Sequence, residues 1–198
     1  ETEKHLDWLF EPDGAQIPHV LVELLSREGL SHESGLGYAR IPAMSFSKVA
    51  ELLRRYEPYA KHDLYRDYPK FRNCFTMCAK VRVLDRYSPN WGDGDKCMNF
   101  GNTGLTLPVD MALSGYRVYG GHELAREVWF ANGKRLEGIR GAVYDPAPEA
   151  ILRQLEEELS RDPGPLRSYD SGGYGMAALQ APSPEHGRGI MLYYGRMA

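Results

Sequence analysis

Apolar residues recur every three or four positions along most of the chain as far as Leu159. This spacing is typical of amphipathic helices that bury one face. It predicts helices over residues 16–27, 45–56, 71–84, 109–119 and 122–131, and one more that begins at Pro148 and ends before Pro163. Short connections that contain glycine favour antiparallel packing of successive helices. The pattern therefore predicts a layer of hairpinned helices.

The pattern changes after Pro165. Residues 174–180 and 190–194 are short runs rich in strand-forming residues, and glycines and prolines separate them. Two strands alone would leave an open edge and an uncovered apolar face. We therefore expect a mainly α fold, with helices over residues 1–165 and the first strands of an antiparallel β-sheet domain over residues 166–198. We also expect the chain to be part of a longer polypeptide.

Composition and charge narrow the range of partners. The chain has 24 basic and 27 acidic side chains and a net charge of -3, so it lacks the basic excess typical of nucleic-acid binders. Its longest uncharged apolar runs are far shorter than the roughly 20 residues that cross a bilayer. Its three cysteines cannot all pair within the chain. We expect neither nucleic acid as a partner nor a membrane span.

Two polar loops carry the candidate chemistry. The first, residues 31–40, follows an apolar helix and includes His32 and Glu33. The second follows a later helix and includes Tyr87 beside Arg86. Positive charge near a phenol favours the phenolate, so this tyrosine could exchange protons. The residues alone also fit a simpler interpretation, in which the first loop is merely solvated and the tyrosine caps a hydrophobic cluster.

Other motifs give no support for metal, phosphate or nucleophile chemistry. Asp93 and Asp95 lack the alternating ligands and the distal glutamate of a calcium loop. Cys74 and Cys78 are four positions apart on a predicted helix, without a CxxC motif or a nearby histidine pair, and we expect them in the core. Neither a phosphate-binding P-loop nor a Gly-x-Ser-x-Gly elbow occurs. We expect no metal ligands in this chain.

The order of elements and the two polar loops resemble the heparinase II/III-like polysaccharide lyases. The resemblance runs from about residue 15 to the end, and its matching stretches are residues 31–38, 86–95 and 171–179, which lead into residues 190–195. In that family an incomplete α/α toroid precedes a domain of antiparallel β-sheets, and the catalytic cleft lies between the two. The resemblance therefore implies that residues 1–165 are part of such a toroid and that residues 166–198 begin the sheet domain.

The resemblance also implies a catalytic pair. The family uses a histidine or asparagine on the earlier loop and a tyrosine on the later one, and His32 precedes Tyr87 by 55 positions, similar to the family's separation. The implied reaction is β-elimination on a uronic-acid-containing polysaccharide, of glycosaminoglycan or alginate type, which leaves an unsaturated uronide end. His32 would neutralise the uronate carboxylate, and Tyr87 would move a proton. Which residue is the base depends on the stereochemistry of the substrate.

Further residues around this pair are candidates for binding sugar or for orienting the catalytic groups. Arg86 and Asn90 are weaker candidate donors for the uronate carboxylate. Trp91 could either stack on a sugar ring or pack against its own loop. The candidates are Glu33, Tyr38, Arg40, Arg86, Asn90, Trp91 and Asp93.

The resemblance has consequences for cofactors, partners and location. The family's histidine-rich segment, and the metal ligands of some members, would follow Ala198, so no cofactor is expected within these residues. The expected partners are an acidic polysaccharide and the rest of the parent polypeptide, in the periplasm or secreted. We expect this piece alone to be inactive, because one wall of its cleft would be missing.

Two other functions are compatible with the residues. One is a glycoside hydrolase on a related α/α barrel, with a carboxylate pair such as Asp93 and Asp95, or with Glu33. The other is a carbohydrate-binding or scaffold module without catalysis. Only the lyase makes a product with a double bond, and the module makes no product at all.

Overall fold

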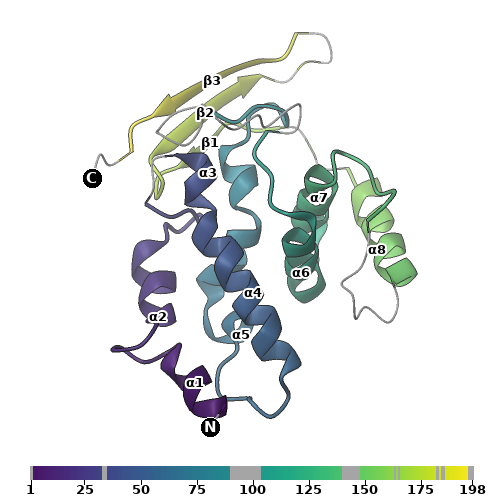
Figure 1. Cartoon of the computed structure of the whole chain (residues 1–198). Coiled ribbons are helices and arrows are strands. Elements are labelled where there is room, and N and C mark those ends of the chain that lie inside the picture. Colours follow the sequence, from purple (N-terminus) through teal and green to yellow (C-terminus); the bar gives the residue numbers. More distant parts are fainter. Residues whose placement is uncertain are drawn as a thin grey trace.

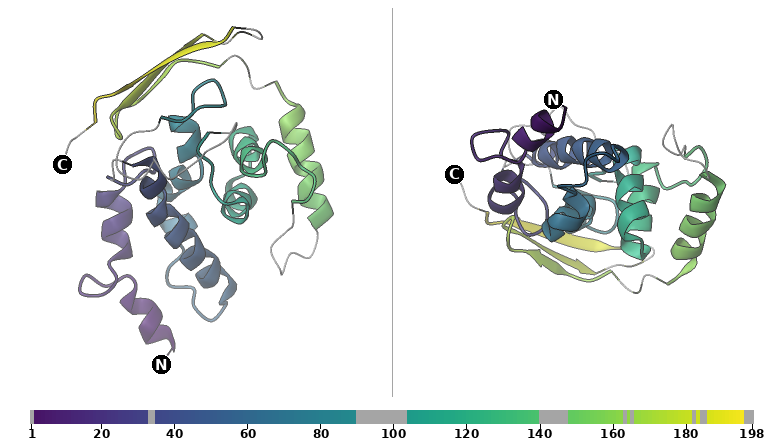
Figure 2. Two further views of the ribbon diagram at one scale, coloured as in Figure 1. Left: turned by 45° about the horizontal axis from the view of Figure 1, so that its top comes forward. Right: turned by 90° about the horizontal axis from the view of Figure 1, so that it is seen from below.

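A computed structural model describes residues 2–32, 35–89, 104–139, 148–162, 164, 166–181, 183 and 186–195. The helices form the body of the molecule, and a small sheet lies across one end of it (Figure 1). Figure 2 shows the sheet as a separate layer beside the helices. The mainly helical chain with antiparallel strands near its C-terminal end, predicted from the sequence, is thus confirmed.

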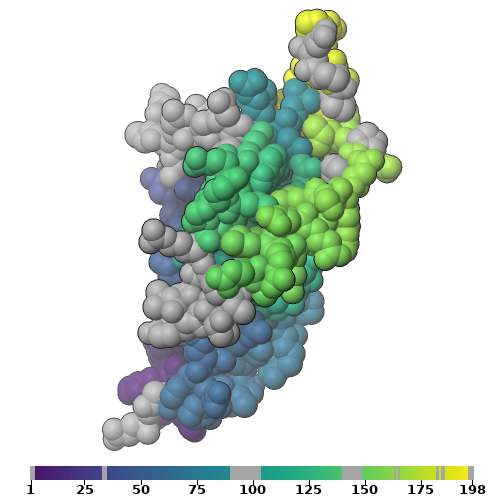
Figure 3. Space-filling view, turned by 90° about the vertical axis from the view of Figure 1, so that its right-hand side faces the viewer, coloured from purple at the N-terminus to yellow at the C-terminus, as the bar shows by residue number. Residues whose placement is uncertain are grey.

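The helical elements vary in length and type. They are α1 (Thr2–Trp8), α2 (Ile17–His19), the π-helical segment η1 (Val20–Leu24), α3 (Leu36–Ala39), α4 (Ile41–Arg55), α5 (Leu64–Asp67), the 3-10 segments η2 (Pro69–Phe75) and η3 (Met77–Val81), α6 (Val109–Tyr119), α7 (His122–Ala131) and α8 (Pro148–Ser160). Figure 3 shows α7 and α8 side by side on one face of the molecule. Among the described residues, every helix is too short or too polar to cross a membrane.

The sheet has three antiparallel strands, β1 (Tyr169–Ser171), β2 (Met176–Ala181) and β3 (Arg188–Tyr193), with β2 in the middle. Met176 is the register partner of Ser171 on one side and of Tyr193 on the other. The inner face of β2 is buried at Met176 and Ala178, whereas Leu179 is 64% exposed on the outer face. One face of the sheet therefore packs on the helices and the other is open.

Several predicted helices match the structure closely. Residues 109–119 and 122–131 are helical with the expected bounds, and α8 begins at Pro148 as expected. The helix predicted from Ser45 begins one turn earlier, at Ile41, because a proline in its first turn favours a helix start there. The helix predicted over 16–27 ends at Leu24, where the chain becomes extended.

The prediction of one helix over residues 71–84 is wrong. The chain forms two 3-10 segments, η2 and η3, and then a hairpin that begins at Val83. The side chains of this stretch are buried on more than one side, at Phe71, Cys74, Phe75, Met77, Cys78 and Val81. Apolar spacing of three or four fits a 3-10 segment as well as an α-helix, so periodicity did not distinguish them.

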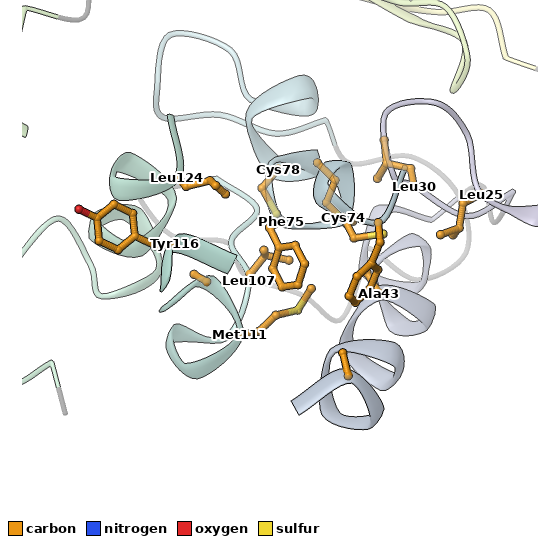
Figure 4. Packing of buried hydrophobic residues seen from close by; sticks show 14 of the residues in the cluster. Leu25, Leu30, Ala43, Cys74, Phe75, Cys78, Leu107, Met111, Tyr116 and Leu124 are labelled. Carbon is orange, nitrogen blue, oxygen red and sulfur yellow. The ribbon is translucent and has the colours of Figure 1, made fainter. Parts of the chain in front are cut away.

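The core is built around η2 and η3. Phe75 is completely buried and lies among Cys74, Cys78, Leu107 and Met111 (Figure 4). The prediction that Cys74 and Cys78 are core residues is confirmed, and burial raises the pKa of both thiols, that of Cys74 to about 12. Both thiols are therefore protonated at neutral pH.

A buried ion pair connects Arg82, directly after η3, to Glu127 of α7. The Arg82 guanidinium donates two hydrogen bonds to the Glu127 carboxylate, 2.9 and 3.0 Å long, and a third to the Leu105 carbonyl at 3.0 Å. The hydroxyl of Tyr169 on β1 donates to the Arg82 carbonyl at 3.1 Å. These contacts join the helical body to the first strand of the sheet.

Candidate functional site

A hollow of about 720 Å³ lies between the helical body and the sheet. Residues 23–26, Ser31 and His32 line it on the helical side, and residues 172–175 and 193–195 line it on the sheet side. Hollows of this size hold small ligands or one part of a larger one. It is the place where the structure brings a predicted catalytic residue, His32, to a concave surface.

A tight turn after η1 places His32 at this hollow. Leu25 and Ser31 pair as an isolated antiparallel bridge, and the amide of Ser26 donates to the Leu30 carbonyl at 2.7 Å. Gly29 has a φ of 85°, and a Cβ there would lie 2.4 Å from the Asn73 backbone. Only glycine fits this position without moving η2. His32 follows the turn, and its side chain is exposed.

The sheet side of the hollow is a turn that a buried carboxylate holds in place. Glu28 is 9% exposed, and its Oε1 accepts hydrogen bonds from the Gly173 amide at 3.2 Å and from Arg27 Nε at 2.9 Å. A Cβ on Gly173 would lie 2.3 Å from Glu28 Oε2. The hydroxyl of Ser171 donates to the Lys80 carbonyl at 2.7 Å. The turn between β1 and β2 is therefore fixed to the helical body.

Three tyrosines line the sheet side of the hollow. Tyr174 and Tyr193 pack against each other, with ring centroids 5.8 Å apart. Tyr194 is 50% exposed, and its hydroxyl donates to the Asp170 carboxylate. This hydrogen bond raises the pKa of the Tyr194 phenol. Tyr194 therefore presents a protonated, half-exposed ring whose hydroxyl is held in place.

A second hollow, of about 200 Å³, adjoins the first. Tyr38, Ile41 and Pro42 line it, and it shares Leu24, Leu25, Ser31 and His32 with the larger hollow. Tyr38 is 46% exposed on α3. The structure thus brings two predicted site residues, His32 and Tyr38, to the same surface.

Arg40 has a different environment. It is half-buried, and its Nη1 donates to the Thr106 carbonyl at 2.5 Å. The bond ties the start of α4 to the segment before α6. Its contact with the backbone makes Arg40 better suited to orienting the loop than to binding a ligand.

Tyr87 is the last residue of a tight hairpin. The amides of Val83 and Tyr87 donate to each other's carbonyls at 2.7 and 2.9 Å. Leu84 and Asp85, between them, have φ angles of 54° and 53°, as a type I′ turn requires. The Tyr87 side chain is 48% exposed, and the Arg86 guanidinium lies 5.1 Å from its ring centroid.

Both the helical body and the sheet hold the tip of this hairpin. Asp85 forms an ion pair with Arg126 of α7, and its carbonyl accepts a hydrogen bond from Lys134 at 3.0 Å. The Leu84 amide donates to the side chain of Gln180, near the end of β2, at 2.9 Å. The hairpin is thus fixed at the end of the sheet that faces away from the turn at Gly173.

His32 and Tyr87 consequently lie near opposite ends of β2. His32 lines the hollow beside the residues that precede Met176, whereas the hairpin contacts Gln180. A strand rises about 3.3 Å per residue, so these ends are roughly 13 Å apart. Tyr87 does not line the hollow at His32.

The other predicted site residues, Glu33, Asn90, Trp91 and Asp93, lie outside the described residues, as does Asp95. Among the residues that are described, no group of three or more His, Cys, Asp and Glu side chains is arranged to hold a metal ion.

Sequence reasoning missed the sheet wall of the hollow. From the sequence, Tyr193 and Tyr194 are interpreted only as part of the strand predicted over residues 190–194. The useful signal was the paired glycines directly before a tyrosine, because two residues without Cβ allow another backbone or a ligand to approach closely.

Comparisons of the chain with models of protein families, with curated proteins and with solved structures found no match.

Proposed function

We propose that this chain is the helical portion and the first sheet of a polysaccharide lyase that cleaves uronic-acid-containing polysaccharide by β-elimination. The helices would belong to an incomplete α/α toroid, and residues 166–198 would begin the sheet domain. The observation that carries the proposal is the exposed His32 imidazole in a hollow between helices and sheet, opposite a wall with three tyrosines. A polar group in a cleft with aromatic walls suits a sugar ligand.

The chemistry assigned to the pair follows from the substrate. The proton next to a uronate carboxylate is barely acidic while that carboxylate is charged. His32 would donate a hydrogen bond to the carboxylate and stabilise the enolate-like transition state. Tyr87 would remove the proton or protonate the leaving glycosidic oxygen. Arg86, which lies over the Tyr87 ring, would add positive charge beside the substrate.

β-Elimination requires both groups at one sugar residue. Because Tyr87 is on a hairpin near the far end of β2, the proposal requires that this hairpin leave its contacts with α7 and β2 and move toward His32 when substrate binds. The same separation favours the second candidate, a carbohydrate-binding module that uses the hollow at His32 without catalysis.

One assay separates these functions. The protein at its natural full length is incubated with uronate polymers, and the absorbance of the unsaturated uronide product is followed. We expect turnover that Tyr87→Phe abolishes and that Tyr56→Phe, at an exposed tyrosine at the end of α4, leaves unchanged. Full activity of Tyr87→Phe would remove Tyr87 from the mechanism. Binding without any product would support the module, and saturated products would support a hydrolase.

The proposal extends to the surroundings of the protein. We propose that it acts in the periplasm or outside the cell, where acidic polysaccharides are found, and that the 198 residues supply no metal ligand. Any metal would come from the continuation of the sheet domain.

A further inference from the structure

We infer that the surface at His32 binds an internal stretch of a polysaccharide, with sugar residues on both sides of the imidazole, so that binding does not require a chain end. The inference builds on the proposed function in taking a saccharide as the ligand. It adds the mode of binding and two residues that hold the sugars, Tyr194 and Tyr38.

The first step is the position of His32. The two hollows, of about 720 and 200 Å³, share Leu24, Leu25, Ser31 and His32. Tyr194 lines only the larger hollow, and Tyr38 lines only the smaller one. A ligand that occupies both hollows must therefore pass His32. A single sugar residue at a chain end would use only one of them.

The larger hollow is suited to a sugar ring. The Tyr194 ring is half-exposed, and the hydrogen bond of its hydroxyl to Asp170 limits its movement. Gly172 and Gly173 form the neighbouring wall, where the Gly173 amide already donates to Glu28. A half-exposed aromatic ring can stack on the C–H face of a sugar, while the exposed His32 imidazole of the same hollow can hydrogen-bond its hydroxyls.

The smaller hollow offers a different surface. Tyr38, 46% exposed, and Ile41, 47% exposed, line it together with Pro42. This surface has few polar side chains, and it suits the less polar face of a neighbouring sugar. A sugar in this hollow would cover the exposed parts of both side chains.

The first test counts protein molecules on each polymer chain. Tyr87→Phe, which is expected to bind without cutting, is titrated onto a long uronate polymer of defined length and analysed by sedimentation. Internal binding predicts a number of bound molecules that rises with polymer length and exceeds two per chain. Saturation at one or two molecules per chain, whatever its length, would overturn the inference.

The second test probes each side of His32. Tyr194→Ala and Tyr38→Ala should each weaken the binding of a long oligosaccharide about three- to tenfold, the size of a lost aromatic contact. Tyr194→Phe keeps the ring and loses only the hydrogen bond to Asp170, so it should bind more tightly than Tyr194→Ala. Tyr56→Ala, at an exposed tyrosine away from both hollows, is the matched control. Unchanged binding by Tyr38→Ala would eliminate the second sugar position.

The outcomes also separate this inference from the proposed function. Internal binding with no unsaturated product from the full-length protein would leave the inference intact and reject the lyase. Unsaturated product together with binding only at chain ends would support the lyase and reject internal binding. Failure of every uronate and neutral polymer to bind would overturn the inference.

Discussion

Arg82 and Glu127 form a bidentate ion pair in the core, and the side chain of each is only 2% exposed. The Arg82 guanidinium also lies 3.8 Å from the centroid of the Phe130 ring. The pair connects the residue just before the Tyr87 hairpin to the middle of α7. The hydrogen bonds of its two terminal guanidinium nitrogens offset part of the cost of taking two charges out of water, whereas the buried Nε has no hydrogen-bond partner among the described residues.

Removing one partner of this pair should destabilise the protein strongly. Arg82→Met leaves the Glu127 carboxylate buried without a partner, and the free energy of unfolding should fall by about 3–5 kcal/mol. The double variant Arg82→Met/Glu127→Leu should lose less, because it removes both charges. Urea unfolding of the single and double variants measures the coupling. A double variant that loses the sum of the two single losses would contradict this account.

Gly173→Ala should loosen the turn that forms the sheet wall of the hollow. The added Cβ would lie 2.3 Å from the buried Glu28 carboxylate, so the turn or Glu28 must move. We expect a loss of about 1–3 kcal/mol in the free energy of unfolding. Gly187→Ala is the control, since a Cβ there meets its nearest atoms at 3.5 Å, an ordinary contact. Equal losses in thermal or urea unfolding would show that Glu28 does not constrain the turn.

The stability of the N-terminal region should depend on the protonation of His62. The imidazole stacks on Phe10 at 3.9 Å between ring centroids, and burial lowers its pKa from 6.5. The folded state therefore prefers neutral His62. The stabilisation that this residue contributes to the folded protein is complete above pH 6.5 and is lost as pH falls toward the lowered pKa of the folded state. His62→Phe keeps a stacked ring and should reduce the fall in unfolding free energy below pH 6.5. His5→Phe, at an exposed histidine of α1, should leave that fall unchanged.

Glu23→Gln should strengthen the binding of acidic polysaccharide. The Glu23 side chain is exposed on the wall of the larger hollow, where its carboxylate repels a uronate. We expect affinity to rise by up to about fivefold at low salt, in line with exposed charge pairs, and the gain to shrink as salt screens the charge. Glu57→Gln, exposed after α4, is the control. The same gain for a neutral polysaccharide would show that the substrate charge is not involved.

The sequence predicted those elements whose formation depends on local pattern. Helices α6 and α7 have one apolar face, and Gly120, at a φ of 61°, separates them, so periodicity and a glycine were sufficient to define them. The segments η2 and η3 are buried on several sides, which hides the difference between helix types. Strand β1 has three residues, too few for a detectable alternation, and it depends on pairing with β2.

The candidate site could be predicted only in part. A polar loop after an apolar helix pointed to His32 and Tyr38, which share a hollow in the structure. The opposite wall comes from residues about 140 positions later, and the hydrogen bond between Glu28 and Gly173 brings it there. No local pattern reports such a contact, because it depends on how the sheet packs on the helical body.

The hairpin that ends at Tyr87 is attached at its tip to α7 through Asp85 and to β2 through Leu84. A tilt of the strands relative to α7 would have to stretch one of these attachments. Since β2 is continuous from Gln180 to Met176, the same tilt would change the gap between His32 and Tyr194. The spacing of the two walls of the hollow should therefore depend also on contacts at the distant end of the strand, and we expect a substitution at Gln180 to change the shape of a hollow that Gln180 does not line.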